Sequence, residues 1–344
     1  MQSQLRLGNY LSYLIGILAS LLLFSVILLA FGYEPLPNLE GLATGSFGTA
    51  FLASETFVLT APLLLAALAF LVPFRARFYN IGVEGQIYVG ALATYLAASQ
   101  LGGVPGVVAI PVVMVSAAFG GTLWLALPLA MRIKLNVNEI FPTLVMNFVA
   151  IDLVNWLTAG PIKAPGSANL ETPFLPRSTW LPVIPGTVLD LGVFVAVVAA
   201  VVVYFIVYRT VLGFEIRASG ANPRAAKGGG IDVSRSVLAV GLMSGSLAGL
   251  AGMVVVAGQE HLLAQNFSPG YGYDGISVSA LGAFHPIGST IAAILYSALW
   301  IGGEGLQRTS EAVPIQLVFA LQAIIVLSVL VVQRLFEERR TRSR

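Results

Sequence analysis

Apolar stretches of about 20 residues recur along this chain and constrain its fold more than any other feature. An α-helix of that length rises about 1.5 Å per residue and crosses the roughly 30 Å hydrocarbon core of a bilayer. Such stretches lie at approximately residues 10–31, 54–73, 82–100, 107–131, 139–158, 187–208, 236–257, 273–284, 287–303 and 314–333. The sequence therefore predicts an all-α polytopic membrane protein with about ten transmembrane segments, in one domain over residues 1–344.

The composition supports this class and excludes several functions. Hydrophobic residues make up 57% of the chain and charged residues 10%, whereas about a quarter of the residues of a soluble domain are charged. The chain has no cysteine, which excludes disulfides, thiolate metal sites and cysteine nucleophiles. The two histidines, His261 and His285, are far apart in sequence and suggest no metal site. A net charge of +2 is too small to indicate nucleic-acid binding.

The basic residues predict the orientation of the chain. With the N-terminus in the cytoplasm, only Lys163, Arg177 and Arg308 of the 18 basic residues fall on the outer side, as the positive-inside rule requires. This favours an even number of crossings, with both termini in the cytoplasm. The charged tail at residues 337–342 is expected to contact anionic membrane lipid.

One predicted segment, at residues 273–284, is too short to cross a bilayer. About 12 residues of helix reach only about 18 Å, so this piece is expected to be a half-helix or a re-entrant segment buried in protein. Its sequence also resembles that of residues 83–92, because each stretch has an acid, then a glycine, then a short apolar helix. Interrupted segments at corresponding places in two halves indicate a central transport pathway, so we predict two pseudo-repeated halves.

Several polar residues stand at the ends of apolar segments. An ionisable side chain at the centre of a membrane helix costs at least about 2.5 kcal/mol, so it faces a cavity or a partner. We predict that these residues line or brace a translocation route: Asn80, Glu84, Gln86, Asn138, Glu139, Asn147 and Asp274. The alternative is that they cap helix starts, which suits Asn80 and Asn138 best.

The largest cytoplasmic loop, residues 213–235, contains the signals of a short helix. Asn222 is suited to the N-cap, Pro223 to the first helical position, and Gly228–Gly230 to the stop. A helix of barely two turns is unstable alone. It is either a charged surface turn or a coupling helix that docks into a cytoplasmic motor. The candidate coupling residues are Arg217, Asn222, Pro223, Arg224, Ala225, Ala226, Lys227 and Gly230.

Four motifs carry a family resemblance. The loop motif Asn222-Pro223-x-Ala225-Ala226 followed by Gly230-Ile231-x-Val233 resembles ABC importer permeases of the ribose and branched-chain amino acid type. The motif Asn80-Ile81-Gly82-x-Glu84-Gly85-Gln86 resembles the nucleoside permease branch, which works with a lipoprotein of the basic membrane protein family. Two more stretches agree: Val137–Ile140 leading to Met146-Asn147, and Gly272–Ile276 leading to His285-Pro286-x-Gly288. Pro142 and the glycine-rich Lys227–Gly229 depart from the usual pattern.

The resemblance implies a transport subunit of the bacterial cytoplasmic membrane rather than an enzyme. A homologous permease would complete the pore, and a lipid-anchored binding protein would deliver a nucleoside or sugar. An ATPase would dock at residues 213–235 and hold ATP and Mg, so this chain would bind no cofactor. No GxxxxGK[ST] motif occurs in it. Gly241, Gly245 and Gly249 predict a smooth helix face for close packing, such as a contact between two permeases.

Other functions stay open at the level of sequence. Simple sugars or branched-chain amino acids are alternative substrates within the importer class. An ion-coupled secondary transporter would use Glu84 and Asp274 as proton or sodium sites, whereas a membrane scaffold would have no use for these acids.

Overall fold

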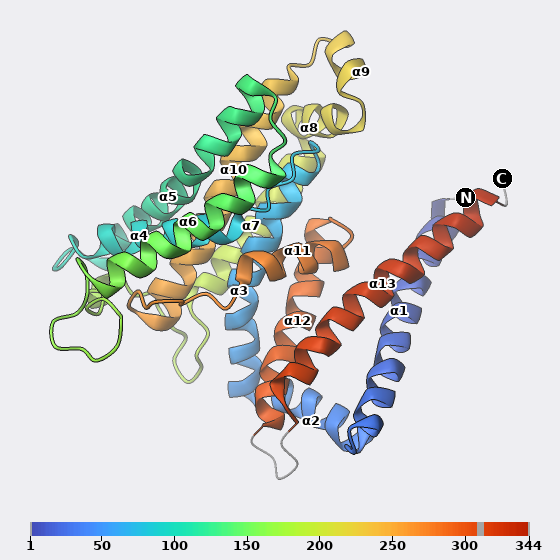
Figure 1. The fold of residues 1–344 in the computed structure, drawn as a ribbon, viewed down its shortest axis with the longest axis horizontal. Coiled ribbons are helices and arrows are strands. Elements are labelled where there is room, and N and C mark those ends of the chain that lie inside the picture. The colour runs from blue at the N-terminus through green and yellow to red at the C-terminus, as the bar shows by residue number, and fades with distance from the viewer. Residues whose placement is uncertain (1, 308–312, 343–344) are drawn as a thin grey trace. The chain divides into compact units, whose positions relative to one another are not determined.

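The structure is a computed structural model that describes residues 2–307 and 313–342. Almost all ordered elements in this part of the chain are helices, and no β-strand forms there beyond two isolated bridges. Arg308, which the charge pattern predicts on the outer side, lies outside the described residues. By their contacts, residues 1–57 and 294–344 form one unit, and residues 58–293 form the second. Figure 1 shows the helices along the chain.

The first unit is built from the two ends of the chain. Its helices are α1 (Gln2–Ala30), α2 (Pro35–Phe47), the beginning of α3 (Ala50–Phe74), the end of α12 (Pro286–Leu306) and α13 (Ile315–Arg342). Helices α1 and α13 approach closely, because a Cβ on Gly16 would come within 2.7 Å of the Val329 Cα. Likewise, a Cβ on Gly302 of α12 would lie 2.2 Å from the Leu42 carbonyl oxygen of α2. Small residues thus allow backbone contact between these helices.

The second unit holds the remaining helices. They are the rest of α3, then α4 (Val83–Ala98), α5 (Gly106–Leu135), α6 (Ile140–Ala159), α7 (Leu191–Arg209), α8 (Val211–Ala221), α9 (Pro223–Gly228), α10 (Val233–Met253), α11 (Tyr271–Leu281) and the beginning of α12. A 3-10 turn occupies Arg177–Thr179, and a π-helical turn, Val254–Glu260, continues α10. Figure 1 shows α8 and α9 at the end of this unit where α3 ends and α10 begins.

Helix α10 packs against α4 and α5 in the core of this unit. A Cβ on Gly249 would lie 2.0 Å from the Ala117 carbonyl oxygen, and one on Gly245 would lie 2.5 Å from the Thr122 Cα. At Gly241 the nearest atoms belong to the Leu129 side chain, at 2.6 Å. The glycine face of α10 is therefore covered by α5 of the same chain and is not free to contact a second permease there.

Within the described residues, seven helices are long and apolar enough to cross a membrane. An eighth span results if the end of α1 and α2, which are bent by 119°, count as one broken span. The predicted total of about ten is not confirmed, because α4 and α11 have only 16 and 11 residues. The sequence predicts no helix at residues 35–47 or 213–221, whereas both ranges are helical in the structure. The first has Pro35 at a helix start, a signal that the hydropathy pattern does not carry.

The segment at residues 160–190 is held by backbone hydrogen bonds to the segment that follows α10. The amides of Thr172, Leu175 and Leu181 donate to carbonyls of Leu263, His261 and Ala257. The Trp180 ring stacks on the His261 ring with a centroid distance of 3.7 Å. These contacts fix a long, mostly irregular segment on the helical bundle.

Asp190, the N-cap of α7, is buried at the end of this segment. Its Oδ1 accepts a hydrogen bond from Gly192 N at 2.7 Å, while its Oδ2 has no hydrogen-bond partner among the described residues. Burial raises the pKa of the Asp190 carboxyl from 3.8 to about 6. The folded state therefore holds this proton more tightly than the unfolded chain does. This proton stabilises the fold at low pH, and the stabilisation is lost as the pH rises from about 4 to 6.

Asp190→Asn is expected to remove this pH dependence, because the amide keeps an acceptor for Gly192 N and carries no charge. The rise of the pKa to about 6 corresponds to about 3 kcal/mol, so the variant should melt at a higher temperature than the native protein at pH 7. Melting temperatures of the detergent-solubilised protein between pH 4 and 8 measure the effect. Asp232→Asn, at an exposed N-cap, is the control and should keep the native pH profile. Parallel profiles for Asp190→Asn and the native protein would contradict the prediction.

Candidate functional site

Glu84 joins the start of α4 to the start of α11. Its side chain is 2% exposed, and its Oε2 accepts a hydrogen bond from Gly272 N at 2.6 Å. A Cβ on Gly272 would come within 2.3 Å of Glu84 N, so only glycine permits this approach. Asp274, in the first turn of α11, is half-buried and close enough to interact electrostatically with Glu84. The two acids that sequence analysis pairs in separate halves thus lie at one junction.

Asn147 connects α6 to the same junction. It is fully buried, and its Oδ1 accepts a hydrogen bond from Gly85 N at 2.8 Å. Its Nδ2 donates to the Ile81 carbonyl at 2.9 Å and to the Tyr273 hydroxyl at 3.2 Å. One amide side chain therefore holds three elements together, and we call the group around Glu84, Asn147 and Gly272 the α4–α11 junction.

Asn80 and Gln86 form a second buried polar pair beside it. The two amides exchange hydrogen bonds of 3.0 Å in both directions. Asn80 also donates to Ser244 Oγ of α10 at 2.8 Å and accepts from Gly82 N, at the start of α4. The N-cap of α4 is Gly82, which has no side-chain cap, so Asn80 lies just before the helix and braces its start against α10.

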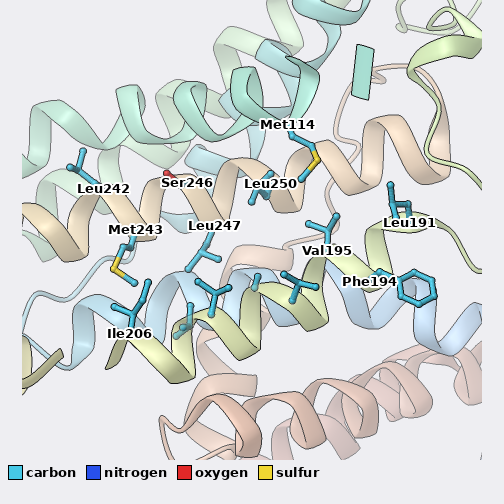
Figure 2. A pocket seen from close by; sticks show the side chains of 14 residues that line it. Met114, Leu191, Phe194, Val195, Ile206, Leu242, Met243, Ser246, Leu247 and Leu250 are labelled. Atoms are coloured by element: carbon cyan, nitrogen blue, oxygen red, sulfur yellow. The ribbon is translucent and has the colours of Figure 1, made fainter. Parts of the chain in front are cut away.

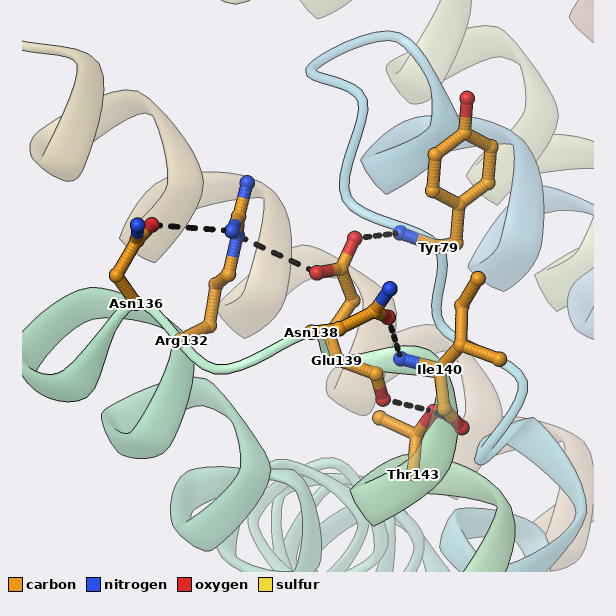
Figure 3. A network of polar contacts seen from close by, with 7 residues as sticks. All are labelled: Tyr79, Arg132, Asn136, Asn138, Glu139, Ile140 and Thr143. Carbon is orange, nitrogen blue, oxygen red and sulfur yellow. Dashed lines mark hydrogen bonds and ion pairs between the residues drawn. The ribbon is translucent and has the colours of Figure 1, made fainter.

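Glu139 ties the start of α6 to the end of α5 (Figure 3). Its Oε2 lies 3.3 Å from Arg132 Nε, and its Oε1 accepts a hydrogen bond from Tyr79 N at 2.9 Å. Asn138 is exposed, and its Oδ1 accepts from Ile140 N at 3.0 Å. Pro142 lies in the first turn of α6, where no intrahelical N–H is required, so this departure from the family pattern does not break the helix.

Burial divides the seven predicted pathway residues. Asn138 is exposed and Asp274 is half-buried. The buried ones, all with hydrogen bonds inside the chain, are Asn80, Glu84, Gln86, Glu139 and Asn147. Their contacts are those of bracing residues. Of the hydrogen-bonding groups beside the α4–α11 junction, those of Tyr273 and Asp274 are the ones partly open to the surroundings.

Three polar residues of the structure are absent from the predicted set. Ser244 and Tyr273 were missed because hydroxyls inside apolar helices are common and carry no pattern. Asp152 was missed although its signal is plain: it is an acid in the interior of a predicted span, and in the structure it is exposed on α6.

The predicted short helix in the loop is α9, with Asn222 as its N-cap. The Asn222 Oδ1 accepts hydrogen bonds of 3.1 Å from Arg224 N and Ala225 N. Ala226 is buried, at 6% exposure, so it packs α9 onto the chain. The side chains that α9 offers to a partner are instead those of Arg224, Ala225 and Lys227, all exposed.

Helix α8 anchors α9 to the membrane helices. A Cβ on its Gly220 would lie 2.0 Å from the Arg75 carbonyl oxygen. The Arg75 guanidinium donates to the Tyr208 hydroxyl at 3.0 Å and to the Phe284 carbonyl, and Arg217 of α8 lies over the Tyr208 ring at 5.6 Å. The α8–α9 segment is therefore connected through Arg75 to the turn between α11 and α12.

A cavity of about 540 Å³ lies between α5, α7 and α10 (Figure 2). Its lining is apolar except for Ser246, whose Oγ is 3.0 Å from Thr122 Oγ1. A hydroxylated substrate would lose its hydrogen bonds to water there and gain none, which is unfavourable. The cavity is therefore not a site for such a substrate.

These features define a membrane transport subunit: a multi-pass helical bundle with a buried polar junction between short helices and a capped helix on an exposed loop. Residues 52–331 match the family described as "Branched-chain amino acid transport system / permease component". The chain belongs to this family of ABC transporter permeases, which work with an ATPase and a substrate-binding protein.

Three relatives are similar over nearly the whole chain. The guanosine ABC transporter permease NupP of Bacillus subtilis is 33% identical over 94% of both chains. The glucose ABC transporter permease TsgB13 of Haloferax volcanii is 32% identical over 90% of this chain and 84% of its own. The nucleoside ABC transporter permease NupB of Lactococcus lactis is 30% identical over 91% and 88%. Each of these organisms also has a second permease relative, 24–26% identical over 70–74% of this chain.

Proposed function

We propose that this chain is the permease subunit of an ATP-driven importer that carries nucleosides across the cytoplasmic membrane. The observation that carries the proposal is the similarity to guanosine and nucleoside permeases over about nine-tenths of the chain. The family motif around Asn80, Glu84 and Gln86 supports it, because Glu84 belongs to the α4–α11 junction and Asn80 and Gln86 form the polar pair beside it. A glucose permease is nearly as similar, so a sugar is the second candidate substrate.

The partly open groups at the α4–α11 junction suit a passing nucleoside. Tyr273 is 37% exposed, and the half-buried Asp274 offers a carboxylate acceptor to ribose hydroxyls or base amines. Weak contacts suffice here, because a separate lipid-anchored binding protein captures the substrate outside the cell. The buried acids and amides act behind these groups and hold the helix starts in place.

Docking of the ATPase occurs on α9. The exposed Arg224 and Lys227 present positive charge to it, and the Arg75–Tyr208–Arg217 contacts link this segment to the α11–α12 turn. ATP-driven closure of the motor would move α8 and α9 and thereby shift α11 at the junction. ATP and Mg would be bound by the ATPase alone.

A second, different permease completes the pore. In three organisms one relative is 30–33% identical to this chain and a second is 24–26% identical. This repeated pattern suits two permease types of which this chain is one. The basic residues favour cytoplasmic termini, with the loop at residues 160–190 outside, where the binding protein docks.

Uptake of a labelled nucleoside tests the function. Cells that express this chain with its second permease, ATPase and binding protein are expected to take up labelled guanosine, and inactivation of the ATPase should abolish the uptake. Unlabelled glucose in excess should not compete. Competition by glucose but not by adenosine or guanosine would assign the sugar instead. Uptake that survives loss of the ATPase and collapses with the proton or sodium gradient would contradict the proposal.

A further inference from the structure

Helix α6 exposes one continuous face that carries an acid at membrane depth. Phe148 is 59% exposed and Trp156 is 63% exposed, and Asp152 lies one turn from each on the same face. Asp152 is exposed and forms no hydrogen bond or ion pair within the part of the chain that the structure describes. Of the seven single-helix spans among the described residues, α6 has the smallest buried share, 22%, so the other helices of residues 58–293 leave this face uncovered.

Lipid is a poor cover for this face. Asp152 follows Ile140, the first residue of α6, by 12 positions, which places it about 18 Å along a helix of about 30 Å. Unlike lysine or arginine, aspartate is too short to reach the headgroups from that depth. Ionisable groups inside a membrane face a partner or a polar cavity, so the surface that covers Asp152 must supply hydrogen-bond donors.

A second polar residue of α6, Asn155, lies close to Asp152. Asn155, one turn from Asp152, donates from Nδ2 to Asn266 Oδ1 at 2.7 Å and accepts from Asn266 N at 3.0 Å. This pair ties the end of α6 to the segment that leads into α11. Asp152 and Asn155 thus place two polar side chains within an otherwise apolar part of α6, and polar side chains of this kind form hydrogen bonds between helices in membranes.

We propose that the Phe148, Asp152 and Trp156 face of α6 is the surface on which the second, non-identical permease subunit packs. The inference rests on the proposed function, since it requires the importer to contain two permease types. The partner helix would bring a donor side chain to Asp152 and apolar side chains to Phe148 and Trp156. Because α6 also holds Asn147, this contact lies on the helix that braces the α4–α11 junction.

The chain has no cysteine, so a single introduced cysteine is the one thiol of this chain that a maleimide can label. A single cysteine at Phe148, labelled with benzophenone maleimide in membranes that contain the tagged complex, is expected to cross-link to the second permease on illumination. Val201→Cys, at an exposed apolar site on α7, is the matched control and should cross-link to lipid. Cross-linking of Phe148→Cys to lipid alone, or to another copy of this chain, would overturn the inference.

Variants at Asp152 test the role of the carboxylate. Asp152→Leu is expected to lower co-purification of the second permease by about three- to tenfold, as loss of one interhelical polar contact does, while Asp152→Asn retains most of it. Were Asp152 to face lipid, Asp152→Leu would assemble at least as well as the native chain, which would contradict the proposal. Loss of uptake in Asp152→Leu with unchanged assembly would place Asp152 in the pathway and overturn it too. Labelled guanosine uptake by the native complex, measured alongside, separates failure of this inference from failure of the proposed function.

Discussion

Glu84→Leu is expected to reduce nucleoside uptake about tenfold or more. The leucine side chain would leave Gly272 N, now bonded to Glu84 Oε2 at 2.6 Å, buried without an acceptor. An unsatisfied buried donor costs about 1–3 kcal/mol, and every 1.4 kcal/mol is a factor of ten in an equilibrium. The start of α11 would then populate other positions, and Tyr273 and Asp274 would move with it. Uptake per membrane-inserted permease, quantified on the same cells, measures the loss.

Glu84→Gln is the matched control, because it keeps the shape and one oxygen for Gly272 N but cannot ionise. Uptake within about threefold of the native level is expected if Glu84 acts as a brace, since the hydrogen bond survives at a net value of about 1 kcal/mol. A loss in Glu84→Gln as large as that in Glu84→Leu would show that transport needs the charge of Glu84, and the bracing role would then be wrong.

The extent of the helices was largely predictable because hydropathy reports burial in lipid or protein directly. Each of the ten predicted segments coincides with a helix. Hydropathy cannot separate a crossing from a shorter helix. Helix α4 is mostly apolar but has only 16 residues, and at its start Gly82 N and Gly85 N donate hydrogen bonds to the side chains of Asn80 and Asn147. The number of crossings therefore depends on contacts that lie far apart in sequence.

The candidate site was predictable in its residue types and less so in their roles. An amide or acid near the end of an apolar segment predicts a polar contact, and Asn80, Glu84 and Asn147 all make one. The partner is decided by tertiary packing, here by Gly272, whose lack of a side chain allows α11 to reach Glu84 N. For this reason the pattern alone could not separate bracing residues from residues open to substrate.

At Ala226 in the cytoplasmic loop, the sequence pattern likewise could not predict which side chains are exposed. The motif that resembles the family singles out Ala225 and Ala226 together, yet Ala226 is buried and Ala225 exposed. On a helix of six residues, which side faces the body depends on how α8 and α10 approach it. The exposed neighbours are therefore the better candidates for contact with the ATPase.

The second large effect is expected from a substitution on the glycine face of α10. Gly249→Leu is expected to prevent α10 from packing on α5, because already a Cβ would lie 2.0 Å from the Ala117 carbonyl oxygen. This neighbour is backbone and cannot rotate away, so the helices must separate. Overpacking costs about 1–3 kcal/mol where side chains can yield, and we expect Gly249→Leu to exceed that range. The measurement is the yield of monodisperse protein in detergent together with its melting temperature.

A graded series separates helix contact from a general effect of larger residues. At Gly241 a Cβ would meet only the flexible end of the Leu129 side chain, so Gly241→Ala should lower the melting temperature less than Gly249→Ala does. Gly102→Ala, where no atom lies within 4 Å, should leave it unchanged. Because α10 carries Ser244, which receives a hydrogen bond from Asn80, its displacement would also release one brace of α4. Equal melting temperatures for Gly249→Ala and Gly102→Ala would mean that α10 does not approach α5 through its glycines.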